Sequence, residues 1–179
     1  MAGISHRMRP ADAPAFHLDP GLRRGERGEK FAPVARTKDT PMIGNLNHVG
    51  VATPSIADSI RLYRDVLGAT KIGEPFDLPH QGVKVCFIDT PTAQIELIEP
   101  FDETSPIVGF LAKNPKGGQH HVCFEVEDIG VAVAEMRARG VTILGTGEPR
   151  IGAHGTPVVF LHPKEMGGVL IELMERADH

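Results

Sequence analysis

The residues Asn47-His-Val-Gly-Val-Ala-Thr53 have a counterpart 73 positions later in the chain, His120-His-Val-Cys-Phe-Glu-Val126. Each stretch begins with a polar residue and a histidine and continues with alternating apolar side chains. That alternation is typical of a strand with one buried face. A segment that recurs in this way indicates an internal repeat. The chain is therefore expected to fold as two related halves.

Both strands lead into an expected helix. Ser55 and Asp128 are candidate N-cap residues, and Gly68 and Gly140 are the expected stops. Apolar residues recur at helical spacing in both helices, which predicts one buried face on each. The matching apolar positions are Ile56, Ile60 and Tyr63 in the first helix and Ile129, Val133 and Met136 in the second.

Short strands separated by Gly and Pro turns complete each half. The expected strands span residues 70–74, 83–89 and 93–99 in the first half and residues 141–145, 157–162 and 169–174 in the second. Each half is therefore a β-α-β-β-β unit, and a short helix from Ser105 to Lys113 is expected between them. The fold class is α+β, in which the two units form a cup-shaped, mostly antiparallel sheet with helices outside.

The first 41 residues differ from the rest of the chain. They contain eight Lys or Arg residues and five acids, a net charge of +3, which leaves −7 for residues 42–179 because the whole chain carries −4. They show no helical or strand period, and we interpret them as a flexible basic leader. The domain that follows is expected to consist of repeat one at 45–100, a linker at 101–117 and repeat two at 118–175.

Composition and charge exclude several classes of protein. No run of about 20 apolar residues is present, so no membrane span or membrane partner is expected. Two cysteines cannot form a disulfide framework. Cys86 and Cys123 lie in apolar runs, which predicts buried thiols in a reducing compartment and a cytoplasmic protein. A charge of −7 on the body argues against nucleic acid as a partner.

Four polar residues interrupt the strand patterns at matching positions. His48 and His121 lie opposite the valines of the first strand of each half, and Glu96 and Glu172 alternate with Ile and Leu in the last strand. If both halves of the sheet curl the same way, all four side chains enter one cup. Two imidazoles and two carboxylates suit an octahedral divalent cation with two positions open to water or substrate. The same alternation places His120 on the other face, as a packing residue.

At these residues the chain resembles the vicinal oxygen chelate superfamily of glyoxalases, bleomycin resistance proteins and dioxygenases, and within it the methylmalonyl-CoA epimerase family. The stretches Ile151-Gly-Ala-His-Gly155 and Leu161-His-Pro-Lys164 favour this family over glyoxalase I and the extradiol dioxygenases. The likeness covers residues 42–175. It implies an isomerase that interconverts the epimers of methylmalonyl-CoA by α-proton abstraction and reprotonation through a metal-stabilised enediolate.

The resemblance also implies roles for individual residues. The four residues in the cup would bind one divalent ion (Co, Mn, Ni, Zn or Mg, with Co favoured), and Glu172 would also transfer a proton. Some members carry a second carboxylate on the strand equivalent to residues 83–89, where this chain has no acid before the last position. The second acid/base therefore stays open among Glu96, Lys84 and His154, in that order.

A CoA thioester substrate carries phosphates, so basic residues near the mouth of the cup are candidate contacts. These residues are Lys113, Lys116, Arg150 and Lys164. The family implies a homodimer. Two alternative functions remain open: a lyase of the glyoxalase I type that acts on a hemithioacetal, and a non-catalytic binding protein of the same fold. The presence of all four ligands argues against the second alternative.

Overall fold

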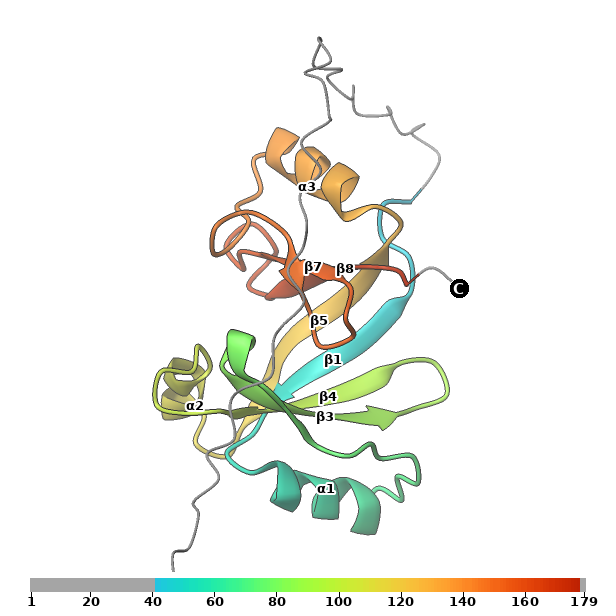
Figure 1. Cartoon of the computed structure of the whole chain (residues 1–179), viewed down its shortest axis with the longest axis vertical. Coiled ribbons are helices and arrows are strands. Elements are labelled where there is room, and N and C mark those ends of the chain that lie inside the picture. The colour runs from blue at the N-terminus through green and yellow to red at the C-terminus, as the bar shows by residue number, and fades with distance from the viewer. Residues whose placement is uncertain (1–40, 178–179) are drawn as a thin grey trace, which may run out of the picture. The chain divides into compact units, whose positions relative to one another are not determined.

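The computed structural model describes residues 41–177. The leader predicted for residues 1–41 lies, except for its last residue, outside the described residues. In the described part, eight strands form one sheet in the order β2-β3-β4-β1-β5-β8-β7-β6. Strands β1 and β5 meet at the centre, and each side of this seam is built from one half of the chain (Figure 1). The predicted repeat and fold class are confirmed.

The first half supplies one side of the sheet. Its elements are β1 (Leu46–Ala52), α1 (Ile56–Asp65), β2 (Phe76–Leu78), the 3-10 helix η1 (Pro79–Gln81), β3 (Val83–Asp89) and β4 (Gln94–Pro100). Strand β1 pairs with β4 in parallel, while β3 pairs antiparallel with β2 and β4. The parallel pair is possible because α1 and the strands after it carry the chain back to the end of the sheet where β1 begins.

The second half repeats this arrangement after the linking helix α2 (Val108–Lys113), which begins three residues later than predicted. Its elements are β5 (Gly118–Val126), α3 (Ile129–Ala138), β6 (Arg150–Ile151), β7 (Pro157–Leu161) and β8 (Ile171–Glu175). Strand β5 pairs with β8 in parallel, and β7 pairs antiparallel with β6 and β8. The antiparallel pairing of β1 with β5 joins the two halves.

The second strand of each half differs from the prediction. Residues 70–74 and 141–145 contribute only one isolated bridge each, and the regular strands β2 and β6 come later in the chain. Pro75 and Pro149 lie between the bridge and the strand. Because proline cannot donate a backbone hydrogen bond to the ladder, both edges of the sheet are interrupted there.

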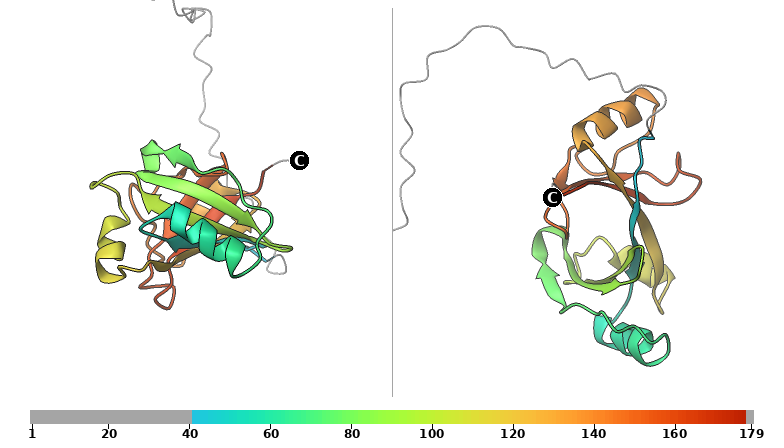
Figure 2. Two further views of the ribbon diagram at one scale, coloured as in Figure 1. Left: turned by 90° about the horizontal axis from the view of Figure 1, so that it is seen from below. Right: turned by 90° about the vertical axis from the view of Figure 1, so that its right-hand side faces the viewer.

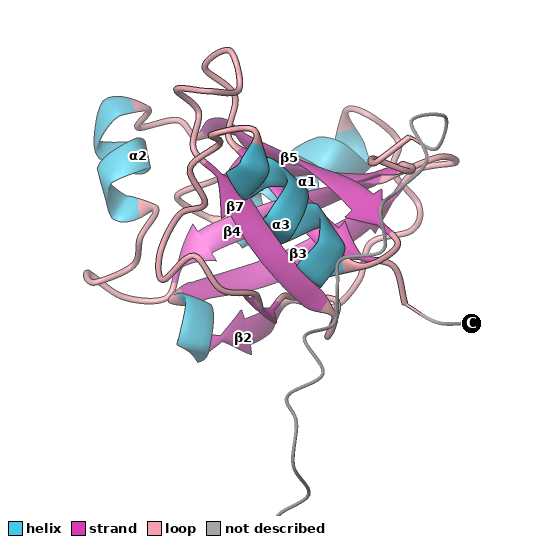
Figure 3. Ribbon diagram, turned by 90° about the horizontal axis from the view of Figure 1, so that it is seen from above, coloured by secondary structure: helices cyan, strands magenta, loops and turns pink. Residues whose placement is uncertain are grey.

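The helices α1 and α3 cover the outer face of the curled sheet (Figure 2), and Figure 3 shows α3 in front of the strands. The predicted N-caps are present: the Ser55 hydroxyl accepts a hydrogen bond from the backbone of Asp58, and the Asp128 carboxylate accepts one from Val131. One apolar cluster lies under each helix, with Ile56 in the first and Met136 in the second.

Two predictions about the environment of the chain can be compared with this fold. Cys86 and Cys123 are free thiols and are completely buried, as expected from their apolar surroundings. Burial raises the pKa of both thiols, so they remain protonated and unreactive. Among residues 41–177, no helix has the length and apolar character needed to cross a membrane.

Candidate metal centre

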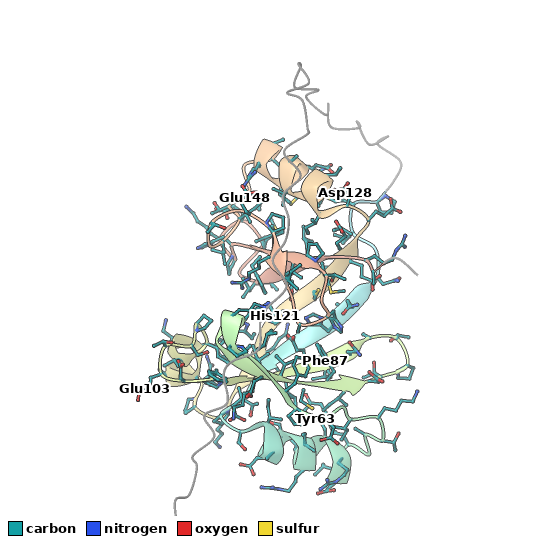
Figure 4. All side chains as sticks on the ribbon, viewed as in Figure 1. Tyr63, Phe87, Glu103, His121, Asp128 and Glu148 are labelled. Carbon is teal, nitrogen blue, oxygen red and sulfur yellow. The ribbon has the colours of Figure 1, made fainter. Side chains whose placement is uncertain are left out.

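The four predicted ligands converge at the seam between β1 and β5. The Nε2 atoms of His48 and His121 lie 3.2 Å apart. An oxygen of Glu172 lies 3.2 and 3.1 Å from these two nitrogens, and an oxygen of Glu96 lies 3.5 and 3.2 Å from them. The four residues are only 2–6% exposed. Figure 4 shows His121 in the middle of the described body, between the half with α1 and the half with α3.

This donor set fits a divalent cation. Two imidazole nitrogens and two carboxylate oxygens meet at one buried point, which is the ligand chemistry of a borderline or hard metal ion. Without a metal, burial tends to lower the pKa of His121, but hydrogen bonds and charges from Glu172 and Glu96 outweigh it and raise that pKa to about 9. Burial likewise tends to raise the pKa of Glu172, and its contacts with the imidazoles lower it. The carboxylates that would bind a cation therefore also favour a proton on the His121 ring.

A β-bulge precedes each ligand histidine. The register of β1 against β5 shifts at two places, and the extra residues are Asn47 in β1 and His120 in β5. An extra residue breaks the alternation of faces, so both side chains turn towards the ligand beside them. The side-chain amide oxygen Oδ1 of Asn47 lies 2.9 Å from Nδ1 of His48, and Nδ1 of His120 lies 3.0 Å from Nδ1 of His121. The expectation that His120 faces away was wrong, because it lines the cavity.

The two bulged residues orient the ligands through different partners. The amide of Asn47 donates to the carboxylate of Glu125 at 2.9 Å, which turns its oxygen towards Nδ1 of His48 and leaves Nε2 for a metal. His120 instead packs edge-on against Phe110, with ring centroids 5.2 Å apart. Burial lowers the pKa of His120 to about 4 and keeps this ring neutral.

Gly50 makes room for the imidazole of His121. The two residues face each other across β1 and β5. A Cβ atom at position 50 would lie 2.0 Å from Cε1 of the His121 ring. Only glycine lets the ring lie against the backbone of β1 in this way, which places Nε2 within reach of its counterpart on His48.

Each ligand glutamate lies three residues before another glutamate that binds a helix. Glu99 accepts a hydrogen bond from the backbone N–H of Ile56 at 2.7 Å, and Glu175 accepts one from Ile129 at 2.9 Å. These contacts tie the ligand strands to the first turns of α1 and α3, where a carboxylate is favoured. The sequence analysis missed them, although the matched Glu-x-x-Glu pattern in β4 and β8 was the available signal.

A cavity of about 580 Å³ opens onto the ligands. Much of its wall is apolar, from residues that include Leu78, Val83, Ile98, Ile107, Val159 and Phe160. Of the other predicted site residues, His154 and Arg150 line the cavity. Lys84 shares the face of β3 with Cys86, which packs under α1, and lies outside the lining. Lys113, Lys116 and Lys164 are exposed and also lie outside it.

Two phenylalanines, 73 positions apart, flank the ligand histidines. Phe87 packs edge-on to His48 with ring centroids 6.2 Å apart, and Phe160 packs in the same way on His121 at 5.6 Å. Their other neighbours differ. The ring of His154 stacks on Phe87 at 4.3 Å, whereas the guanidinium of Arg150 lies 5.2 Å from the ring centre of Phe160. Sequence reasoning missed both phenylalanines as site residues.

Comparisons with known proteins agree with this geometry. Residues 47–160 match the Glyoxalase/Bleomycin resistance protein/Dioxygenase superfamily. The chain is 54% identical over 132 residues to the ethylmalonyl-CoA/methylmalonyl-CoA epimerase of Cereibacter sphaeroides, covering 74% of this chain and 98% of the relative.

Two solved structures share the fold. The methylmalonyl-CoA epimerase of Mycobacterium tuberculosis has a TM-score of 0.71 and 33% identity, over 78% of this chain and 92% of that one. A variant of the Streptomyces coelicolor methylmalonyl-CoA epimerase, in complex with 2-nitronate-propionyl-CoA, has a TM-score of 0.69 and 32% identity. That match covers 76% of this chain and 99% of the other.

Proposed function

The chain belongs to the Glyoxalase/Bleomycin resistance protein/Dioxygenase superfamily and, within it, to the methylmalonyl-CoA epimerases, and we propose that it interconverts the epimers of methylmalonyl-CoA with one divalent cation. The observation that carries this proposal is the meeting of two imidazole nitrogens and two carboxylate oxygens, 3.1–3.5 Å apart, at the wall of a large cavity. The choice of methylmalonyl-CoA as the substrate rests on the names of the relatives.

The cation would be held by His48, Glu96, His121 and Glu172. When bound, it would act as a Lewis acid that makes the substrate C–H between carboxylate and thioester more acidic. The reaction then needs only a group that accepts the α-proton and a group that returns one to the other face. Glu172 suits one of these roles because it lines the cavity and its strand is fixed to α3 through Glu175.

The rest of the cavity suits a CoA thioester. Its apolar wall would accept the short alkyl group of the substrate, and Arg150 is the predicted CoA contact that lines it. A guanidinium binds anionic oxygens well, so we propose that Arg150 binds an anionic group of the substrate. Lys113, Lys116 and Lys164 remain candidates for the phosphates of the longer CoA arm.

The experiment that tests the function is α-proton exchange in heavy water. Protein stripped of metal is expected to leave methylmalonyl-CoA unchanged, and addition of Co²⁺ is expected to start both deuterium incorporation and epimerisation. A hemithioacetal substrate is the control for a glyoxalase I-type lyase. Conversion of the hemithioacetal without exchange of methylmalonyl-CoA would contradict the proposal, and absence of both reactions would favour a binding protein.

The two carboxylates can be separated by amide substitution. Glu172→Gln keeps an oxygen ligand but removes the base, so epimerisation should be lost with metal still bound. Glu96→Gln is the matched control at the equivalent position of the other half, and should keep most of the epimerisation. Near-normal epimerisation by metal-loaded Glu172→Gln would refute a proton-transfer role for Glu172.

We also propose that the enzyme is a cytoplasmic homodimer. The two buried, reduced thiols suit a reducing compartment. Light scattering of the purified full chain tests the dimer: a mass near twice 19.3 kDa is expected, and a monomer at working concentration would contradict it.

A further inference from the structure

Epimerisation needs two proton-transfer groups, and only Glu172 has been given this role so far. The remaining titratable groups in the cavity are mostly engaged elsewhere. Glu96 lies within 3.5 Å of both ligand nitrogens and is itself a ligand. Glu148 is exposed and pairs with Arg137 at 2.9 Å. His120 turns one nitrogen to His121 and packs on Phe110. His154 is left.

His154 lies beside the ligands without belonging to them. Its ring centre is 5.6 Å from that of His48, and its ring stacks on Phe87. In the described part of the chain, its Nε2 atom is buried and has no hydrogen-bond partner. Buried polar atoms are normally paired, so this unpaired imidazole nitrogen, on a residue that lines the substrate cavity, lacks a partner that a group on the substrate could supply.

The loop that carries His154 holds it in a fixed place. It is the tight turn between β6 and β7, closed by hydrogen bonds from Gly152 to Thr156 and from Gly155 to Gly152. A Cβ at position 152 would lie 2.7 Å from the side chain of Val158, so the turn packs directly on β7. The turn belongs to the second half, yet its imidazole rests on Phe87 of the first. His154 therefore reaches across the seam to the ligand His48 and to Phe87.

His154 also borders a second cavity, of about 590 Å³. This cavity has a more polar wall that includes Asn45, Glu125 and Thr156, and it shares with the first cavity only His154 and Met174. The hydroxyl oxygen of Thr156 is buried there without a partner in the described residues. The imidazole thus stands between the substrate cavity and a polar space suited to water.

We infer that His154 is the second acid/base and acts on the face of the α-carbon opposite Glu172; this inference rests on the proposed function. In one direction, Nε2 of neutral His154 takes the α-proton, and the electron pair of the C–H bond stays on the substrate as an enolate. The carboxyl group of Glu172 delivers a proton, drawn from water, to the other face. His154 then releases its proton to water through the second cavity, so that protons balance.

The test is to follow each epimer separately in heavy water. With wild-type protein, both epimers exchange the α-proton. With metal-loaded His154→Gln, epimerisation should fall about 100-fold or more. One epimer should still exchange its α-proton, with its configuration retained through Glu172, while the other should not exchange. His154→Asn is the second variant, and His162→Gln, at an imidazole outside both cavities, is the matched control.

Several outcomes would overturn the inference. Normal epimerisation by both variants would show that His154 transfers no proton. Loss of exchange for both epimers, or loss of the metal, would give it a structural or ligand role instead. Failure of the wild-type protein to exchange either epimer would be a different result, because it would contradict the proposed function itself.

Discussion

The half of the sheet with α1 and the half with α3 bring the same parts to the metal centre. Each supplies one histidine from its first strand and one glutamate from its last strand, with a bulged residue before the histidine. Each also places a second glutamate on the first turn of its helix. The framework that positions the ligands is thus duplicated in detail.

The surroundings of the ligands are not duplicated. In the first half, Asn47 contacts the ligand histidine and is held by Glu125, which belongs to the second half. In the second half, this place is taken by His120. The two aromatic neighbours also carry different groups, His154 on Phe87 and Arg150 near Phe160. Metal binding is therefore a shared task of the halves, whereas the residues proposed for proton transfer and anion binding, Glu172, His154 and Arg150, all come from the second half.

The largest expected effect tests whether the ligand histidines of the two halves contribute equally to metal binding. His48→Ala and His121→Ala should each abolish metal binding and the whole metal-dependent rate, because each removes one of two nitrogen donors from a four-donor site. Metal analysis and α-proton exchange measure both. Retention of one metal per chain by either variant would break the equivalence of the halves.

The next largest effect is a pH dependence of metal affinity, which arises from His121 in the second half. Metal binding must displace the proton on His121, whose pKa is about 9 in the metal-free protein. Apparent affinity should therefore fall by up to about tenfold per pH unit below that pKa, and by about 50-fold between pH 9 and pH 7. Calorimetric metal titrations across this range measure it, and a constant affinity would contradict it.

The same proton gives a matching dependence of stability. The folded-state pKa of His121 lies above its ordinary value of 6.5. Its contribution to the stability of the metal-free protein is therefore fully present below about pH 6.5 and is lost as the pH rises through about 9. Melting temperatures of metal-free and metal-loaded protein should diverge over this interval.

A smaller effect separates the two bulged residues. Asn47→Ala should weaken metal binding about 10- to 100-fold, since it removes the hydrogen bond that orients His48. Glu125→Gln should act in the same direction. His120→Phe should weaken metal binding less than Asn47→Ala. The new ring can still pack on Phe110, and the contact that His121 loses is one with a neutral imidazole. Equal losses in dissociation constant for Asn47→Ala and His120→Phe would remove this difference between the halves.

The smallest effect returns to the shared framework. Ser55→Ala and Asp128→Ala each remove one N-cap hydrogen bond and should each lower the free energy of unfolding by about 1 kcal/mol. Denaturant titrations of the metal-loaded protein would measure the two losses. A cost at one cap more than twice that at the other would show that the helices are not equally supported.

Sequence alone predicted most of what depends on regular alternation. The period of two placed Glu96 and Glu172 on the inner face, and the repeat paired them with the histidines. It failed at His120 because a bulge adds a residue and reverses the expected face. It also failed at residues 70–74, where a nearby proline interrupts the strand.

The sequence could not establish contacts made by loops across the seam. His154 lies in a glycine-flanked turn, and no periodicity in the second half predicts that it stacks on a phenylalanine of the first. The exclusion of Lys84 from the cavity also needed the structure, since it depends on which face of β3 packs under α1. Long-range packing decides both positions.

The seam between β1 and β5 has a consequence for how the protein reaches its final state. Each half pairs its own strands over shorter distances in sequence than the seam, which joins segments about 73 positions apart and is expected to form later. Since each half holds only two of the four donor atoms, a chain with separate halves has no complete centre. The rate of tight metal uptake during refolding therefore measures how fast β1 pairs with β5 and joins the two halves.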